Sequence, residues 1–288
     1  KFLVEEGMLS KGQLDQVYRT QEQNHAKMGV IAVSEKLMTI AQAEEINALQ
    51  ASRDMRFGDL AIARGYLQEE QVERLLEKQT NEFLAFTQAI IDRGYMTLDE
   101  VTGSVTIYQK KYGLLESDME ALKVGDIERI VPIFMGTDQR EYESLFAIAI
   151  KNIYRLVDAH IYIGRARTVR EYQGEALGYQ KMRGDCSALM AFTGKYEDLQ
   201  KMAIAYTKEE FIETREDALD ALCELINCIN GLFATQNSLQ GSSIELEPPV
   251  YLSGFASIAA VEMVIMPVYM DNAEIELIVS LEKDVSVR

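Results

Sequence analysis

Residues Asp220–Gly231 read D-A-L-C-E-L-I-N-C-I-N-G, and the periodicity around this stretch predicts an amphipathic helix. Side chains advance by about 100° per residue in a helix, so residues spaced by three and four share a side. One side is entirely apolar and consists of Leu219, Leu222, Ile226, Ile229 and Phe233. The opposite side consists of Asp220, Glu224, Asn227 and Gly231. We therefore expect the apolar side to be packed in a core and the polar side to be exposed.

Small residues border the polar side of this predicted helix. They are Ala221, Cys228, Ala234 and Thr235. A solvated helix face usually carries long charged side chains, so a face of small residues predicts close approach by another surface. The pair Glu224 and Asn227 is less specific, because Glu-x-x-Asn occurs on many helices by chance.

The same residues resemble the signature helix of the CheC/CheX/FliY phosphatases of bacterial chemotaxis, which reads Asp-x3-Glu-x2-Asn with a proline a little over twenty residues later. Here the pattern is Asp220, Glu224 and Asn227, followed by Pro248 and Pro249. The resemblance implies that Glu224 and Asn227 enter the active site of a phosphorylated CheY-like receiver. Glu224 would reach a lysine of the receiver, and Asn227 would orient a water for in-line attack on the aspartyl phosphate. Phosphoryl transfer depends mostly on positioning and charge stabilisation, which suits these residue types.

The resemblance also assigns partner contacts and a metal. Asp220, Cys228 and Gly231 would bind the receiver, with Gly231 four residues after the Asn as in CheX-like members. The receiver would supply Mg²⁺, so we expect no cofactor and no metal site in this chain.

The segments around the helix predict a mixed α/β domain. We expect helices over 142–158 and 196–207, strands over 160–165, 174–182, 186–193, 244–254, 260–271 and 273–283, and a hairpin turn at Asp271-Asn272. This order resembles the pseudo-symmetric CheC/CheX fold, in which long helices pack on an antiparallel sheet. The first long helix has Asn152 but Ala149 in place of a glutamate, so we expect Asn152 to be a packing or capping residue and the domain to have one active centre.

The N-terminal part contains an internal repeat. Gln21, Gln50, Gln79 and Gln109 are spaced by 29, 29 and 30 residues, and aligning on them brings similar segments into register. Each unit reads as a short helix, a turn and a longer amphipathic helix. A unit of this size must stack on its neighbours to bury its apolar side. We therefore predict an α+β protein of two domains, an all-α helical-repeat domain over 1–125 and the CheX-like domain over 126–288.

The repeat resembles the MshEN domain, a tandem cyclic-di-GMP module of secretion and pilus ATPases. Residues 27–50 and 56–79 are both 24 residues long with a five-residue spacer, as in that family. The resemblance implies a nucleotide site at Lys27, Gly29, Arg56 and Gly58. The sequence departs from the family at Lys27 and Lys36, which replace an arginine and a glycine. A structural or partner-docking role therefore ranks ahead of nucleotide binding.

Composition limits the classes of partner. The formal net charge is −17, from 29 Lys and Arg against 46 Asp and Glu. An acidic chain lacks the basic footprint that nucleic acid requires, and it is not suited to an anionic membrane surface. No apolar run approaches the length of a transmembrane helix, so we expect no membrane span. The three cysteines form no metal spacing and indicate a reduced, cytoplasmic protein.

Two hypotheses follow from these patterns. The first is a CheX-like phosphatase acting on a phosphorylated CheY-like receiver. The second is a non-catalytic signalling adaptor that binds a receiver, while the N-terminal repeats bind cyclic-di-GMP or a second protein. A stable protein without receiver contact and a homodimer through sheet edges are further alternatives.

Overall fold

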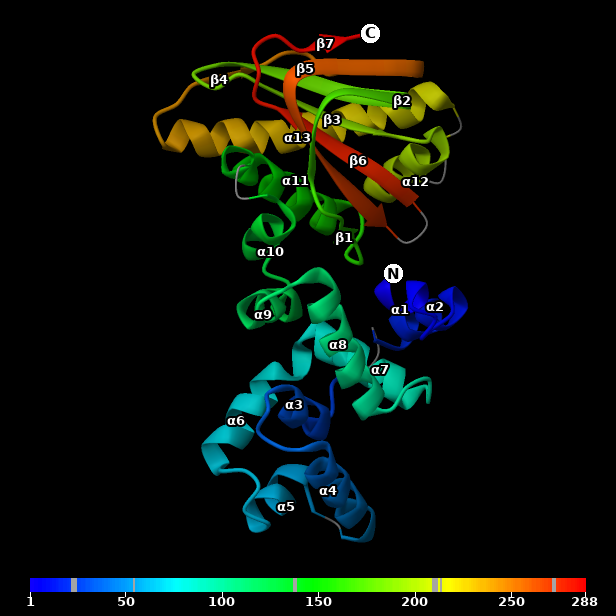
Figure 1. Ribbon diagram of the computed structural model, residues 1–288, viewed down its shortest axis with the longest axis vertical. Helices are drawn as coiled ribbons and strands as arrows, with labels where there is room; N and C mark the ends of the chain where they lie inside the picture. The colour runs from blue at the N-terminus through cyan, green and yellow to red at the C-terminus, as the bar shows by residue number, and fades with distance from the viewer. Residues whose placement is uncertain (22–24, 54, 137–138, 209–211, 213, 271–272) are drawn as a thin grey trace. The chain divides into compact units, whose positions relative to one another are not determined.

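A computed structural model describes residues 1–288 except 22–24, 54, 137–138, 209–211, 213 and 271–272, and leaves out the side chains of 51 and 52 (Figure 1). Contacts divide the chain into two compact units, Lys1–Asp126 and Ile127–Arg288. Each unit is described by itself below.

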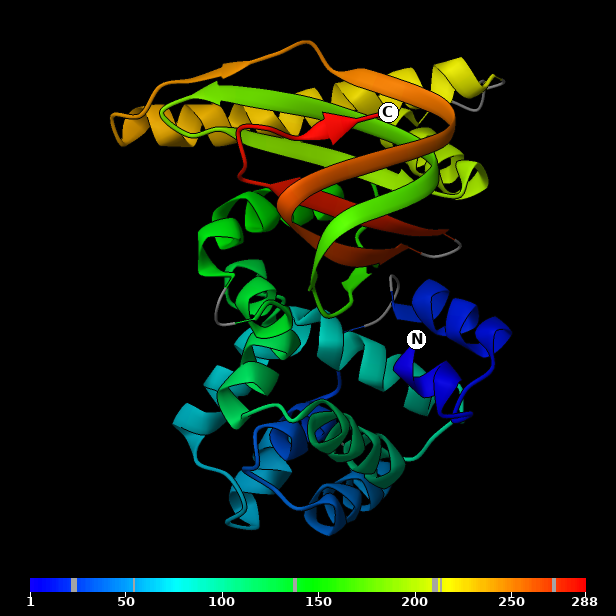
Figure 2. The same cartoon turned by 45° about the horizontal axis from the view of Figure 1, so that its top comes forward.

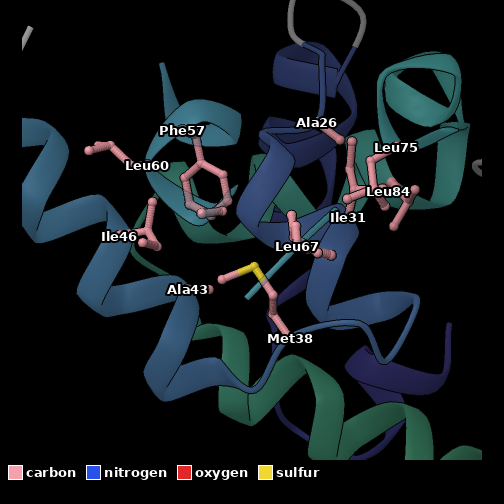
Figure 3. Packing of buried hydrophobic residues seen from close by; sticks show 12 residues of the cluster. Ala26, Ile31, Met38, Ala43, Ile46, Phe57, Leu60, Leu67, Leu75 and Leu84 are labelled. Atoms are coloured by element: carbon pink, nitrogen blue, oxygen red, sulfur yellow. The ribbon is translucent and has the colours of Figure 1, made fainter. Parts of the chain in front are cut away.

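The described part of the first unit is helical. Its helices are α1 (Phe2–Glu5), α2 (Lys11–Gln21), α3 (Met28–Ser34), α4 (Ile40–Ser52), α5 (Phe57–Ala63), α6 (Glu69–Glu77), the 3-10 turn η1 (Lys78–Thr80), α7 (Glu82–Asp92), α8 (Leu98–Tyr112) and α9 (Glu116–Val124). Short and long helices alternate because apolar residues recur at helical spacing between turn residues. Buried residues from α3 to α7, including Ile31, Ile46 and Leu75, form one continuous core (Figure 3).

The same left-handed turn recurs in the first unit. Gly7, Lys36, Gly65 and Gly94 have φ angles of 68°, 58°, 74° and 68°. Three residues after each turn comes a residue whose backbone N–H donates to a side-chain oxygen three positions further on. These pairs are Ser10 with Gln13, Thr39 with Gln42, Gln68 with Gln71, and Thr97 with Glu100. The helices α2, α4, α6 and α8 therefore all begin with the same kind of cap.

The second unit combines helices with one sheet. Its elements are α10 (Ile127–Phe134), the 3-10 turn η2 (Arg140–Tyr142), α11 (Glu143–Leu156), β1 (Tyr162–Ile163), β2 (Arg167–Gly184), β3 (Ala188–Gly194), α12 (Tyr196–Thr207), α13 (Arg215–Leu239), β4 (Ile244–Leu246), β5 (Val250–Met270), β6 (Ala273–Ser280) and β7 (Ser286–Val287). The antiparallel sheet has the order β1-β5-β6-β3-β2-β4, with β7 paired to β5.

The long strand β5 curls the sheet back on itself. Its C-terminal part pairs with β6, while residues from Val250 to Ile265 pair with β2 (Figure 2). The enclosed face is filled by an apolar cluster that includes Leu177, Ala191 and Ile258. The other face of the sheet is covered by helices, because α13 packs on β2, β3 and β5, and α11 and α12 pack against α13.

Gly178 on β2 lets α13 approach the sheet closely. A Cβ added at Gly178 would lie 3.2 Å from Leu222 Cδ2 and 3.4 Å from Ile226 Cδ1. Side chains alternate between the two faces of a strand, so Gln180, two residues further on, faces α13 as well.

Several element boundaries differ from the sequence prediction. The segments 244–254 and 260–271 were expected as two strands, but the chain forms β4, a break at Pro248 and Pro249, and then one strand of 21 residues. Gly254, where the first of these strands was expected to end, has φ +104° and forms part of a bulge, and pairing with β2 continues on both sides of it. The expected strand over 160–165 is reduced to Tyr162–Ile163, and the one over 174–182 begins at Arg167. The predicted turn at Asp271-Asn272 lies outside the described residues.

Candidate functional site

The site is built on α13, whose start is set by a capping box. Thr214 N donates to Asp217 Oδ2, and Asp217 N donates to Thr214 Oγ1, each over 3.1 Å. This reciprocal pair satisfies two backbone donors that a helix N-terminus leaves unpaired. The helix then runs for 25 residues along the sheet.

The two predicted sides of α13 are confirmed. All five residues of the apolar side are buried, with exposed fractions from 0% to 6%: Leu219, Leu222, Ile226, Ile229 and Phe233. On the opposite side Asp220, Glu224, Asn227 and Cys228 are exposed, and Gly231 is half-buried. Burial of the apolar side holds the backbone of α13 rigidly, so the exposed side chains project from a fixed support.

The borders of this face differ from the prediction in two places. Ala221 was expected at the exposed border, but it is buried with Ala203, Ile212 and Ala218, because α12 packs against that side. Leu232, which was not predicted, has 46% of its surface exposed. The exposed face therefore carries acidic side chains at Asp220 and Glu224, and small or apolar side chains towards Leu232.

The carboxylate of Glu224 lies beside Tyr206 of α12. Burial raises the pKa of the Tyr206 hydroxyl, and the nearby Cys228 and Glu224 raise it further. Within the described residues, Glu224 has no hydrogen-bond or ion-pair partner. Its charge is therefore not neutralised by the described part of the fold.

Asn227 is exposed, but its side-chain oxygen accepts a hydrogen bond from a buried residue of the sheet. Gln180 Nε2 donates to Asn227 Oδ1 over 2.7 Å and to the Glu247 carbonyl over 2.7 Å. Gln180 Oε1 in turn accepts from Asn230 Nδ2 over 2.9 Å. Gln180 and Asn230 were not predicted from the sequence, and the signal for Gln180 was a polar residue between Gly178 and Met182 on the helix-facing side of β2.

A second centre is not formed on α11. Asn152 has 9% of its surface exposed, and its Nδ2 donates to the Ile148 carbonyl over 2.8 Å. The prediction that Asn152 has a packing or capping role is confirmed, since the amide serves the helix itself.

In the first unit, the four residues of the proposed nucleotide site lie at the starts of α3 and α5. Lys27 and Arg56 are the N-cap residues of these helices, and Gly29 and Gly58 are the buried second residues of α3 and α5. The two segments interlock: a Cβ on Gly29 would lie 3.2 Å from Phe57, and one on Gly58 would lie 3.4 Å from Met28 Sδ and 2.8 Å from Val72.

This packing accounts for both glycines without a ligand. The Lys27 ammonium also pairs with Asp92 Oδ1 over 2.7 Å, which partly neutralises its charge. Cyclic-di-GMP binding therefore stays a prediction that rests on the MshEN resemblance.

Two further features bear on the chemistry. Cys186, Cys223 and Cys228 are free thiols, and the described residues contain no cluster of three or more His, Cys, Asp or Glu side chains suited to a metal. In the described part of the chain, α13 is also long and apolar enough to cross a membrane by length and composition, which the sequence analysis overlooked. In this fold 56% of its most apolar window is buried against the sheet and neighbouring helices, as in a core helix.

The fold and the site define a mixed α/β unit whose central helix exposes a carboxylate and an amide. Residues 176–264 match the family model described as "Chemotaxis phosphatase CheX". The matched segment runs from β2 into β5 and contains Gln180, α13 and Pro248. Within the second unit, residues 176–264 are therefore similar to the CheX family.

Solved structures were also compared with the chain. Chemotaxis protein CheX from Desulfovibrio desulfuricans is 14% identical, with 49% of this chain and 98% of that chain covered and a TM-score of 0.43. A CheC-like superfamily protein from Shewanella is 16% identical, covering 50% and 97%, with a TM-score of 0.42. The CheX–CheY–BeF3–Mg²⁺ complex from Borrelia burgdorferi is 17% identical, covering 51% and 96%, with a TM-score of 0.40. No curated protein matches the chain.

Proposed function

We propose that this protein is a phosphatase that hydrolyses the aspartyl phosphate of a CheY-like receiver. The observation that carries the proposal is the environment of Glu224 and Asn227. Both side chains stand on the exposed face of a helix whose opposite face is locked into the core. The CheX family match over residues 176–264 supports the reaction class.

The reaction is a displacement at phosphorus. The oxygen of a water forms a bond to phosphorus, and the bond between phosphorus and the aspartyl carboxyl oxygen breaks. The electron pair of that bond stays on the carboxylate, and both hydrogens of the water leave with inorganic phosphate. An acyl phosphate already has a good leaving group, so the remaining requirement is mainly to hold the water in line.

Asn227 is suited to hold that water. A carboxamide can donate and accept hydrogen bonds without becoming charged, so it orients a water without adding negative charge beside the phosphoryl group. Glu224, one helical turn earlier, would pair with a lysine of the receiver and align the two surfaces. The receiver would supply Mg²⁺, and the chain itself would need no cofactor.

The test is dephosphorylation of phosphorylated CheY-like receivers by the native chain and by Asn227→Ala. We expect acceleration by the native protein and none by the variant, with little loss of stability, because Asn227 is exposed and Gln180 Nε2 keeps its hydrogen bond to the Glu247 carbonyl. Gln236→Ala is the matched control, since Gln236 is an exposed residue of the same helix outside the polar face, and it should retain full activity.

The same experiment can instead favour the non-catalytic adaptor. Tight binding of a phosphorylated receiver without acceleration would contradict the phosphatase and favour the adaptor.

For the first unit we propose a structural or partner-docking role, because the helix contacts of Gly29 and Gly58 explain these residues without a nucleotide. We place the protein in the cytoplasm with its receiver.

A further inference from the structure

A buried polar cluster lies directly beneath Asn227. It consists of Gln180 on β2, Asn230 on α13 and the carbonyl of Glu247, which follows β4. Gln180 has 1% of its surface exposed and Asn230 has none. Burying polar amides between a helix and a sheet is costly unless their hydrogen bonds are made, so these residues require an explanation.

The hydrogen bonds of the cluster have only one consistent polarity. The Glu247 carbonyl can accept but cannot donate, so the Gln180 group facing it must be the NH2. The other Gln180 atom is then an acceptor and requires the NH2 group of Asn230. The second hydrogen of Gln180 Nε2 points to Asn227, whose oxygen must therefore face inward. One backbone carbonyl thus dictates the orientation of three side-chain amides.

We infer that Gln180 is a positioning residue that fixes the Asn227 carboxamide with its oxygen inward and its NH2 group outward. The inference rests on the proposed phosphatase function, for which Asn227 would hold the water. Without Gln180, an exposed asparagine can rotate about its terminal bond and exchange its donor and acceptor sides. With Gln180, the NH2 group is presented towards the partner before the receiver arrives.

The Glu247 carbonyl, which sets the orientation of the amides in the cluster, is itself held in place. Glu247 N donates to the Lys181 carbonyl over 2.9 Å, and the Glu247 side chain pairs with Arg183. Glu247 precedes Pro248, and a residue before proline is restricted to extended conformations. The position of Pro248 in the chain is therefore linked to Asn227 through the Glu247 carbonyl and Gln180.

The cluster also contains a buried polar atom without a hydrogen bond, which a network that only stabilised the fold would avoid. Asn230 Oδ1 is buried and has no hydrogen-bond partner among the described residues. Turning the Asn230 amide would place its oxygen against Gln180 Oε1, so the unpaired atom follows from the polarity that the cluster imposes. A positioning role for Asn227 explains why this arrangement is kept.

The experiment compares the native chain with Gln180→Leu and Gln180→Glu, using a phosphorylated CheY-like receiver as substrate. Leucine removes all three hydrogen bonds at similar size. Glutamate keeps the shape, but its carboxylate cannot donate to Asn227 or to Glu247. We expect each variant to lower kcat at least about tenfold, since small misplacements of a catalytic group have large effects, while KM changes less than about twofold.

The matched control is Thr193→Val. Thr193 is buried like Gln180, and its Oγ1 donates to the Ala176 carbonyl over 2.8 Å, but it does not touch Asn227. This variant should lose stability without losing kcat. If Gln180→Leu fails to fold, Gln180→Glu provides the same comparison.

A second readout does not depend on activity. The side-chain NH2 signals of Asn227 in a ¹⁵N NMR spectrum can be assigned by their loss in Asn227→Ala. Their relaxation should show slow rotation of the carboxamide about the Cβ–Cγ bond in the native chain and faster rotation about that bond in the Gln180 variants. Unchanged Asn227 signals, or an unchanged kcat in a folded Gln180 variant, would overturn the positioning role. Equal activity of the native chain and Asn227→Ala would instead refute the proposed function, and the NMR comparison would still decide whether Gln180 holds Asn227.

Discussion

Cys223 and Cys228 lie five residues apart on α13 but on opposite sides of the helix. Cys223 is buried, whereas Cys228 is exposed directly after Asn227. The two thiols therefore report on the core side and on the exposed side of the same helix.

This difference predicts selective labelling. Burial raises the pKa of Cys223 to about 12, and the charge of Asp220 adds to this shift. Only the thiolate reacts, so at pH 8 about one part in ten thousand of Cys223 is reactive. We expect a thiol reagent to modify Cys228 rapidly and Cys223 only after unfolding, as followed by mass spectrometry of peptides. Rapid modification of Cys223 in the folded chain would contradict the buried placement.

Labelling of Cys228 should also block the partner face. An adduct beside Asn227 adds bulk where a receiver must approach closely, so receiver binding and dephosphorylation should both fall at least about tenfold. The measurement is activity after treatment with N-ethylmaleimide, and Cys228→Ser should be active and insensitive to the reagent. Full activity of the labelled native chain would place the receiver elsewhere.

Removal of the Glu224 charge should weaken association more than folding. Glu224→Gln keeps the shape of the side chain but cannot pair with a receiver lysine. We expect the Kd for a receiver to rise about tenfold at low salt, and this difference should shrink as ionic strength increases. Glu175→Gln is the control, because Glu175 is an exposed carboxylate on β2 rather than on α13. Equal losses in both variants would point to net charge rather than to a specific contact.

Gly58 provides a stability prediction for the first unit. A Cβ at Gly58 would lie 2.8 Å from Val72 Cγ1, so Gly58→Ala should destabilise the unit by about 1–3 kcal/mol through overpacking. Gly12 is the matched control, since it is also the second residue of its helix but has nothing within 4 Å of an added Cβ. Gly12→Ala should be neutral or stabilising in urea denaturation. Similar destabilisation by both substitutions would show that local helix effects outweigh the packing.

The sequence was most informative where structure depends on local periodicity. The two sides of α13 follow from the spacing of residues such as Leu222 and Asn227, because a helix assigns each residue a direction without reference to the rest of the chain. The ends of α12 were predicted at Tyr196 and Thr207 for the same reason.

The features that were missed all depend on tertiary contacts. Gln180 meets Asn227 only because β2 lies under α13, and the two residues are 47 positions apart. Ala221 is buried because α12 covers it, which the periodicity of α13 does not reveal. The strand expected over 244–254 was expected to end at Gly254, but β5 continues through a bulge there because β2 pairs with it on both sides.

Lys36 leads to the last prediction, because it occupies a left-handed turn where the other three equivalent positions have glycine. Its φ is 58°, in the region that side chains with a Cβ disfavour, while its ammonium pairs with Glu116 of α9. Both side chains of this pair are mostly exposed, at 71% and 59%, so solvent screens the attraction. We expect the backbone strain to outweigh the ion pair.

The comparison of Lys36→Gly with Lys36→Ala isolates that strain. Both substitutions remove the ion pair, but only glycine removes the Cβ, so Lys36→Gly should have the higher thermal unfolding midpoint. Gly65→Ala tests the equivalent turn in reverse: an added Cβ there meets nothing within 4 Å, so its expected cost of about 1 kcal/mol comes from the backbone alone. If Lys36→Gly and Lys36→Ala are equally stable while Gly65→Ala is destabilised, the turn at Lys36 is not strained, and the lysine is retained there for its contact with Glu116.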